Sequence, residues 1–374
     1  MDLRKIFMKG ACPTSIGGQA ILEGIMMRGP KKTAIAIRLA DGRIHIKTEP
    51  TQQASKLGKM PIIRGVVNFV SALVMGTKVL MYSADVLEKS YPQEYEKGKF
   101  DSWVENKLGK EKAWNILMIF SVVLALIFSV GIFMLLPTVV TGWMTKVTDN
   151  ILLLNLAEGF VRILLFIVYI WAISKMKDIE KVFQYHGAEH KTIHCYENGL
   201  ELTPANVQTF YTLHPRCGTS FLMFVMVIAI LVHCFMGWPN VWLRMGSRII
   251  VLPLIAGLSY ELLKWAGRSD NWLVKALSLP GIYLQKLTTK EPNDSQVEVA
   301  IAAVKAVLPD RDDEPFFEGI CDLDGRPIKS SDEADEEVKI SIEEGTGGEA
   351  SLSAEETDQK KEENVSENEE EKIV

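Results

Sequence analysis

Residues 116–136 read ILMIFSVVLALIFSVGIFMLL, a run of 21 residues without a charged side chain. A helix needs about 20 mostly apolar residues to cross the hydrocarbon core of a bilayer. Three further segments approach this pattern, at residues 151–174, 221–238 and 249–265. The sequence therefore predicts a mainly α-helical, polytopic membrane protein with about four transmembrane helices.

Lysine and arginine are distributed unevenly among the connections between these segments. They are frequent before the first segment, between the second and third, and after the fourth, and they are sparse in the other two connections. Cytosolic connections of membrane proteins carry an excess of Lys and Arg. The alternation favours four spans in the cytoplasmic membrane, with both termini in the cytosol.

Residues 62–81 form a fifth apolar segment, which Arg64, Asn68 and Lys78 interrupt. These polar residues favour an interfacial or re-entrant amphipathic helix over a fifth span. A fifth span would place the N-terminus outside if the other spans kept their orientation.

The N-terminal region contains one clear strand signal. Apolar and polar side chains alternate within residues 33–49, TAIAIRLADGRIHIKTE, on both sides of Asp41 and Gly42. An Asp-Gly pair is favoured in hairpin turns. We expect a small β-hairpin here. Residues 17–30, GGQAILEGIMMRGP, are rich in glycine and predict a loop whose backbone approaches another element closely; its two methionines could instead simply pack on a neighbour.

Composition divides the chain into three predicted regions. Residues 1–112 form an N-terminal cytosolic region, residues 113–307 the transmembrane and histidine-loop domain, and residues 308–374 a disordered acidic tail. Residues 331–374 carry 17 acidic and 4 basic side chains and no aromatic residue. Such a segment cannot bury enough apolar surface to offset its chain entropy. An amphipathic surface helix is expected just before the tail, around residues 297–307.

Four of the six histidines lie between the second and third predicted spans. Residues 177–197 suit a helix, on which His186 and His190 are one turn apart on the same face. Two imidazoles at this spacing can bind one metal ion, and Glu189 can approach the same face. His194 lies about 12 Å along the axis from His186 at a rise of ~1.5 Å per residue, too far to share that ion.

The segment before the third span offers further ligands. A compact turn around His214 and Cys217 could bring either residue back to the His186 and His190 face. A mixed His, Cys and Glu set suits zinc. The predicted site therefore comprises His186, His190 and either His214 or Cys217, with Glu189 as a ligand or catalytic base. An open position for water would suit hydrolysis, with Glu197 as another candidate base.

Other interpretations of these residues stay open. The histidines could form a polar helix face, and Cys195 and Cys217 could be reduced thiols of the core. A nucleophilic pair is a further alternative, with Cys217 beside His214 or Cys195 beside a neighbouring histidine. His233, inside the third span, could bond to another helix or act within the membrane.

Two sequence blocks carry a family resemblance. GGQAILEGIMMRGP (residues 17–30) and YHGAEHKTIHCYE…LTPANVQTFYTLHPRCGTSFL (residues 185–222) resemble the YqhQ family of bacterial membrane proteins of unknown function. LQKLTTKEPNDSQVEVAIAA (residues 284–303) resembles it too, and the likeness covers roughly residues 10–307. The family is commonly labelled a predicted metal-dependent enzyme, which is an inference from its histidine motif. The resemblance implies a bacterial membrane protein and supplies no substrate.

The first functional hypothesis is a metal-dependent hydrolase or transferase that acts on a membrane-associated substrate. The alternative is a non-enzymatic scaffold or accessory factor, for instance in membrane-protein insertion, that contacts the insertion machinery or other membrane proteins. A transporter is less well supported because the sequence shows no paired broken helices or internal repeat. Nucleotide-binding and nucleic-acid-binding motifs are also absent from the sequence.

Overall fold

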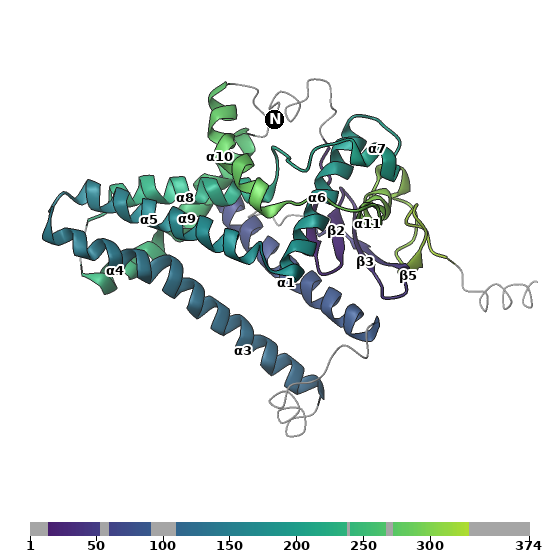
Figure 1. Ribbon diagram of the computed structural model, residues 1–374, viewed down its shortest axis with the longest axis horizontal. Coiled ribbons are helices and arrows are strands. Elements are labelled where there is room, and N and C mark those ends of the chain that lie inside the picture. The colour runs from purple at the N-terminus through teal and green to yellow at the C-terminus, as the bar shows by residue number, and fades with distance from the viewer. Residues whose placement is uncertain (1–13, 53–59, 91–109, 238–239, 267–271, 329–374) are drawn as a thin grey trace, which may run out of the picture. The chain divides into compact units, whose positions relative to one another are not determined.

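A computed structural model describes residues 14–52, 60–90, 110–237, 240–266 and 272–328. The chain is mainly helical, with a five-stranded antiparallel sheet built largely from its N-terminal part (Figure 1). The predicted fold class is therefore confirmed. The predicted disorder of residues 331–374 concerns a segment outside the described residues.

The sheet follows the chain in the order β1-β2-β3-β4-β5, and every neighbouring pair is antiparallel. Its strands are β1 (Gly17–Ile21), β2 (Gly24–Arg28), β3 (Lys32–Arg38), β4 (Ile44–Pro50) and β5 (Glu318–Cys321). The predicted hairpin is the β3–β4 pair, and Gly42 at its turn has a φ of 83°. Strand β5 was not expected, because its residues fall in the region predicted as a disordered tail.

The glycine-rich segment at residues 17–30 is not a loop, as predicted, but forms strands β1 and β2. Glycine is unfavourable in strands unless another backbone comes close, and here it does. A Cβ at Gly24 would lie 2.2 Å from the Ala36 carbonyl oxygen, and one at Gly18 would lie 3.0 Å from Glu189 Cδ. The predicted close approach is therefore correct, although the predicted backbone conformation was wrong.

Each face of the sheet is covered by helices, because strand residues alternate between the two faces. On one face, Ile25 and Met27 belong to a core shared with α6 (Lys177–Glu197) and α11 (Asp294–Lys305). On the other face, Met26 and Ile37 pack with Val79 of α1 (Ile63–Ser90). Full burial of such a side chain contributes about 1.5–3 kcal/mol. Helix α6 is therefore fixed against β1 and β2 by a continuous apolar core.

Four helices are long and apolar enough to cross a membrane: Ile63–Ser90, Ile119–Lys146, Ile151–Ile173 and Val241–Trp265. The first, third and fourth are α1, α5 (Ile151–Ile173) and α9 (Val241–Ala266). The second consists of α3 (Lys110–Val130) and α4 (Leu136–Gly142), which a π-helical turn (Gly131–Leu135) connects. A 3-10 turn (Trp143–Lys146) follows α4. Helix α8 (Gly218–Cys234), a predicted span, is a shorter apolar helix. These findings indicate a multi-pass membrane protein.

The contacts of α1 distinguish it from the other long apolar helices. Its first turn pairs with the C-terminal part of α9 through Arg64 and Glu261, with 2.6 Å between Arg64 Nε and Glu261 Oε1. Farther along, Phe69 lies 5.9 Å from Phe221 in the first turn of α8, measured between ring centroids. The rest of the helix packs on the sheet through Val79. Helix α1 therefore packs on both α9 and the sheet, and its interfacial position stays a prediction beside its length and composition, which also suit a span.

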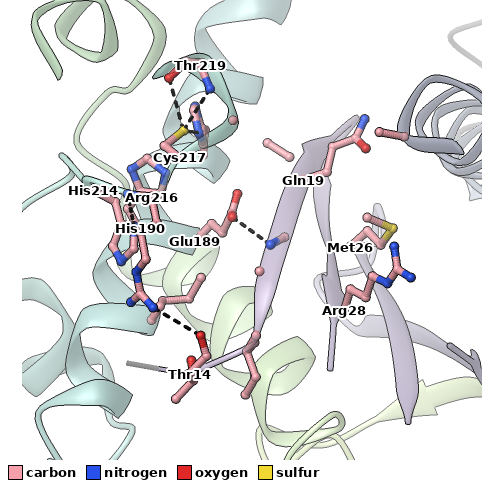
Figure 2. A pocket seen from close by; sticks show the side chains of 18 of the residues that line it. Thr14, Gln19, Met26, Arg28, Glu189, His190, His214, Arg216, Cys217 and Thr219 are labelled. Carbon is pink, nitrogen blue, oxygen red and sulfur yellow. Dashed lines mark hydrogen bonds between the residues drawn. The ribbon is translucent and has the colours of Figure 1, made fainter. Parts of the chain in front are cut away.

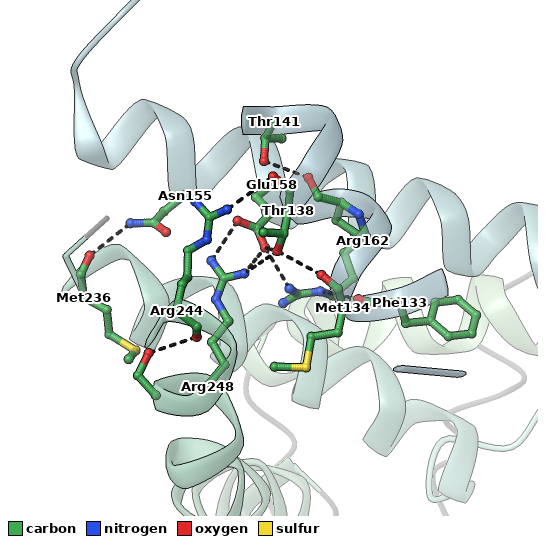
Figure 3. Close-up of polar contacts among 12 residues, drawn as sticks. Phe133, Met134, Thr138, Thr141, Asn155, Glu158, Arg162, Met236, Arg244 and Arg248 are labelled. Atoms are coloured by element: carbon green, nitrogen blue, oxygen red, sulfur yellow. Dashed lines mark hydrogen bonds and ion pairs between the residues drawn. The ribbon is translucent and has the colours of Figure 1, made fainter. Parts of the chain in front are cut away.

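A buried polar cluster connects α4, α5 and α9 (Figure 3). Glu158 of α5 is 1% exposed and pairs with Arg248 through both carboxylate oxygens, with 2.8 Å between Arg248 Nη2 and Glu158 Oε2. Arg162 and the Thr138 hydroxyl donate to the same carboxylate, at 3.1 and 2.9 Å. One carboxylate thus compensates a buried and a half-buried guanidinium group within the predicted membrane region.

Replacing Glu158 by Gln should destabilise the helix bundle strongly. Breaking a buried ion pair by removing one partner costs about 3–5 kcal/mol, because the remaining charge is left uncompensated. Thermal unfolding in detergent micelles, followed by tryptophan fluorescence, measures this loss. The control is Asp85→Asn, which removes an exposed i,i+4 pair with Lys89 and should barely change the midpoint. Equal midpoints for the two variants would show that the cluster does not stabilise the bundle.

Candidate metal centre

Helix α6 carries the histidines and matches the predicted helix at residues 177–197. It ends at a C-cap residue, Asn198, followed by Gly199 with a φ of 69°, the left-handed conformation that glycine favours after a helix. Gly187, within the histidine motif, lets the helix pack closely on the segment after α10 (Trp272–Thr288). A Cβ at Gly187 would lie 2.0 Å from the Lys290 carbonyl oxygen.

Backbone carbonyl groups orient the rings of His186 and His190. The distance from His186 Nδ1 to the Thr288 carbonyl oxygen is 2.8 Å, and that from His190 Nδ1 to the Thr212 carbonyl oxygen is 2.5 Å. A carbonyl oxygen can only accept a hydrogen bond, so Nδ1 carries the proton in both neutral rings. In the neutral form of each ring, Nε2 is therefore left with a lone pair, as in histidines that bind metals.

Cys217 completes a three-residue metal-binding group with His186 and His190. It is the N-cap residue of α8, and its Sγ lies 3.2 Å from His186 Nε2. One ligand atom from each of the three residues lies within 4.8 Å of the others. The turn before α8 thus returns to the histidine face, and its cysteine provides the converging atom.

The predicted ligand His214 lies beside this group but is turned away from it (Figure 2). Its Nδ1 accepts a hydrogen bond from the Arg216 amide at 3.3 Å, so the proton of the neutral ring is on Nε2. That atom faces Glu197, 3.8 Å from Oε2. Burial lowers the pKa of His214 to about 4. Of the two alternatives predicted for the third ligand, only Cys217 therefore offers an atom to the His186 and His190 pair.

Glu189 projects from α6 toward strand β1 (Figure 2). Its Oε1 accepts the Gly18 amide at 3.0 Å, whereas its buried Oε2 has no hydrogen-bond partner among the described residues. Burial raises the pKa of Glu189, although the neighbouring His186 and His190 partly oppose this effect. A buried carboxylate oxygen without a partner is costly. The free oxygen therefore fits a further metal ligand or a proton acceptor at this site.

The two partners Cys217 and His186 shift each other's protonation. Burial alone would raise the pKa of Cys217, but the imidazoles of His190 and His186 hold it well below its usual range. Burial would lower the pKa of His186, but the charges of Cys217 and Glu189 raise it to about 9. The neighbouring imidazoles therefore favour the thiolate of Cys217, which is the form that binds metals and acts as a nucleophile.

A second set of contacts fixes the turn that carries Cys217. Arg216 pairs with both oxygens of Glu197, which also accepts the Thr14 amide at 2.9 Å. Burial would raise the pKa of Glu197, but His214, the Thr14 amide and Arg216 lower it to about 2. Glu197 is therefore a permanent anion in an ion pair, which makes it a poor candidate for the catalytic base that we also considered.

Sequence reasoning missed several residues that position the site. Arg216 lies next to Cys217 but belongs to no ligand pattern. Gln285 of α10 is fully buried and bonds the backbone of His214 twice, each time at 2.8 Å. Its position in one of the family-like blocks, residues 284–303, was the only available signal.

The remaining candidate residues lie apart from this group. His194 bonds the Leu213 carbonyl oxygen through Nε2 at 3.0 Å. Cys195 is fully buried in the core, and burial raises its pKa to about 11. His45 of β4 lies 2.7 Å from the Tyr82 hydroxyl, measured from Nε2. Cys195 thus lies in the core as a free thiol, as one alternative expected, whereas Cys217, also free and buried, borders the cavity beside His186.

An open cavity of about 580 Å³ gives access to the group. Its wall includes His186, Glu189, His190 and Cys217 on one side and strands β1 and β2 on the other (Figure 2). Ala72 and Met75 of α1 also line it. The arrangement can therefore hold a metal ion at the wall of a space large enough for a small organic group.

Comparisons with known proteins place these residues in a family context. A family model described as "Protein of unknown function (DUF1385)" matches residues 60–310. The uncharacterized protein YqhQ of Bacillus subtilis (strain 168) is 36% identical over 310 residues, which cover 80% of this chain and 94% of that protein. No solved structure matches the chain.

Replacing Glu197 by Gln should reduce stability at neutral pH and have a diminishing effect in acid. The folded-state pKa of Glu197, about 2, lies below the ordinary value of 4.5. Its contribution is therefore complete above about pH 5 and is lost as the pH falls toward 2. Thermal midpoints of metal-free protein between pH 7 and pH 2.5 measure this change. Glu201→Gln, which alters an exposed carboxylate, serves as the control. A difference between wild type and variant that stayed constant down to pH 2.5 would contradict the assignment.

Proposed function

From the premise that the chain belongs to the DUF1385 family, whose description assigns no activity, we propose that it is a metal-dependent hydrolase or transferase acting on a membrane-associated substrate. The ligands would be His186, His190 and Cys217, and the metal would be zinc. One observation carries the proposal: two carbonyl-oriented imidazoles and a thiolate converge on a cavity beside a buried carboxylate oxygen without a partner.

The donor set supports zinc in a catalytic rather than a structural role. Nitrogen and thiolate ligands suit zinc, and structural zinc sites are usually closed by four protein ligands. Here three ligands converge, and the adjoining side is a cavity. When bound, such an ion supplies Lewis-acid polarisation of a carbonyl or phosphoryl group and lowers the pKa of water.

Glu189 is the proposed general base. The Gly18 amide holds one of its carboxylate oxygens, which leaves the other to face the cavity. Its raised pKa moves it toward the range in which a carboxylate accepts and returns a proton efficiently near neutral pH. Gly18 thus acts as an orienting group, and its lack of a side chain permits this approach of the carboxylate.

The position of the group supports a substrate from the membrane. Helix α6 begins four residues after the end of α5, and Cys217 directly precedes α8. Cys217, and with it the group, therefore lies at the N-terminal end of α8, an apolar helix that the sequence predicts to cross the bilayer. The distribution of Lys and Arg favours the cytosolic side for this end of the helices.

A second candidate function follows from the contact between Cys217 and His186. A thiolate at a helix N-terminus, 3.2 Å from an imidazole, is also the arrangement of a cysteine nucleophile. In acyl transfer, Cys217 Sγ would form a bond to the carbonyl carbon and His186 would protonate the leaving group. The metal hypothesis requires His190 as a ligand, whereas the nucleophile hypothesis does not require it.

Purified protein should contain about one zinc ion per chain, the stoichiometry of a mononuclear site. His186→Ala, His190→Ala and Cys217→Ser should each lose most of this metal, because each removes one of three ligands. His45→Gln and Cys234→Ser are matched controls that should retain it, since both residues lie outside the group. Elemental analysis by mass spectrometry gives the readout. Equal zinc content in wild type and in the His186 and His190 double variant would exclude the proposal and leave the scaffold alternative.

Zinc should protect Cys217 from alkylation, which separates the two candidate functions. In metal-free protein the thiolate should react with iodoacetamide, and added zinc should suppress this reaction at Cys217 but not at Cys234. His190→Ala should abolish the protection. The readout is peptide mass spectrometry after timed labelling. Rapid labelling of Cys217 that zinc does not alter would favour the cysteine nucleophile.

A further inference from the structure

The middle of α1, residues 70–74, connects two anchored parts of the helix. On its N-terminal side, Gly65 packs so closely on α9 that a Cβ would lie 2.8 Å from the Gly257 Cα. On its C-terminal side, Val79 and Ser83 are buried against the rest of the protein. Between these anchors all five residues are exposed.

This exposed stretch is apolar, although a bridging helix in water should be polar. Val70, Leu73 and Val74 are 51%, 56% and 53% exposed, and Ala72 is exposed beside them. Ser71 is the one polar residue of this stretch, and an apolar helix surface is normally buried in protein or in lipid. The neighbouring α8 and α9 are apolar helices of the proposed membrane bundle, so lipid is the environment that fits this exposed stretch.

The same stretch forms part of the cavity that contains the metal-binding group. Ala72 and Met75 line the cavity together with His186 and Cys217. Gly76 lets α1 approach β1, since a Cβ there would lie 2.8 Å from Gln19 Nε2. One wall of the cavity is therefore a helix whose outer surface suits hydrocarbon.

The first turn of α8 borders the cavity on the side next to α1. Gly218 and Thr219 line the cavity, and Phe221 contacts Phe69 of α1. The next residue, Leu222, is 39% exposed. The apolar surface thus continues from α1 onto α8, directly at the end of the helix that carries Cys217.

We propose that the cavity receives its substrate sideways from the bilayer, past Ala72 and Met75. The substrate class is an amphiphile whose hydrocarbon chain lies along the middle of α1 and whose polar head reaches the group formed by His186, His190 and Cys217. Polar side chains also line the cavity and can bond to that head, among them Thr14 on the side of α6 and Gln19 beside Gly76 of α1 (Figure 2). The reaction at the head rests on the proposed function, whereas the binding of the chain does not.

The test uses the full chain reconstituted in phosphatidylglycerol vesicles that contain a phosphatidylglycerol with a diazirine in its acyl chain. After irradiation, peptide mass spectrometry should find lipid adducts on residues 70–76 and on the cavity residues of β1 and α6. Ala72→Trp should reduce the adducts on β1 and α6 severalfold, because the indole fills the entrance. Leu80→Trp is the matched control on an exposed position of α1 outside the cavity, and its adduct pattern should equal that of wild type.

Met75→Lys provides a second variant that places a charge at the entrance without adding bulk, and it should lower the same adducts. Adducts absent from residues 70–76, or unchanged at β1 and α6 in both variants, would overturn the proposal. Covalent dimers formed through residues 70–76 in place of lipid adducts would also overturn it, because a second copy would then cover the helix.

The outcome can be separated from that of the metal hypothesis. The His186 and His190 double variant should retain the adducts, because chain binding does not need the metal. Adducts without bound zinc in wild type would refute the metal and keep the lipid route. Zinc without adducts would keep the metal and refute the lipid route.

Discussion

The burial of a polar helix constrains the structure around the site more than any other feature. Helix α6 buries Glu189, His190, Lys191, His194 and Glu197. Buried polar groups are costly unless they find hydrogen-bond partners. The surrounding segments supply those partners: carbonyl groups at Thr212, Leu213 and Thr288, the Gly18 amide and the Arg216 side chain. The paths of the turn before α8, the end of α10 and strand β1 all follow from this requirement.

A few polar atoms of α6 have no hydrogen-bond partner or keep a lone pair, and these atoms lie close together. Among the described residues, Glu189 Oε2 has no hydrogen-bond partner, and in the neutral rings of His186 and His190 the Nε2 atoms carry lone pairs because a carbonyl oxygen holds Nδ1. These atoms border the same cavity as the Cys217 thiolate. These electron-pair donors therefore form a group that could hold a metal ion.

Features that depend only on neighbouring residues could be predicted from short stretches of the sequence. The 177–197 helix, the spacing of His186 and His190, and the hairpin at Gly42 all follow from periodicity or turn chemistry. Strands β1 and β2 were missed because glycine disfavours a strand unless a tertiary neighbour comes close, and such neighbours are not visible in a sequence. The choice between His214 and Cys217 depended likewise on a distant partner, since Glu197 and the Arg216 amide determine how the His214 ring is turned. Hydropathy alone leaves open whether α1, which is long and apolar enough to cross a membrane, spans the bilayer or lies at its surface.

The exclusion of His214 gives the site its proposed chemistry. With four protein ligands, the group would be a closed site that could only stabilise the fold. The Glu197–Arg216 pair prevents this closure in two ways: it fixes the turn at residues 214–217, and it presents a carboxylate to His214 Nε2. The side of the group next to Glu189 therefore stays open to the cavity. The same cavity is also lined by apolar residues of α1. An ion pair that takes no part in ligation therefore determines whether a metal here would be structural or reactive.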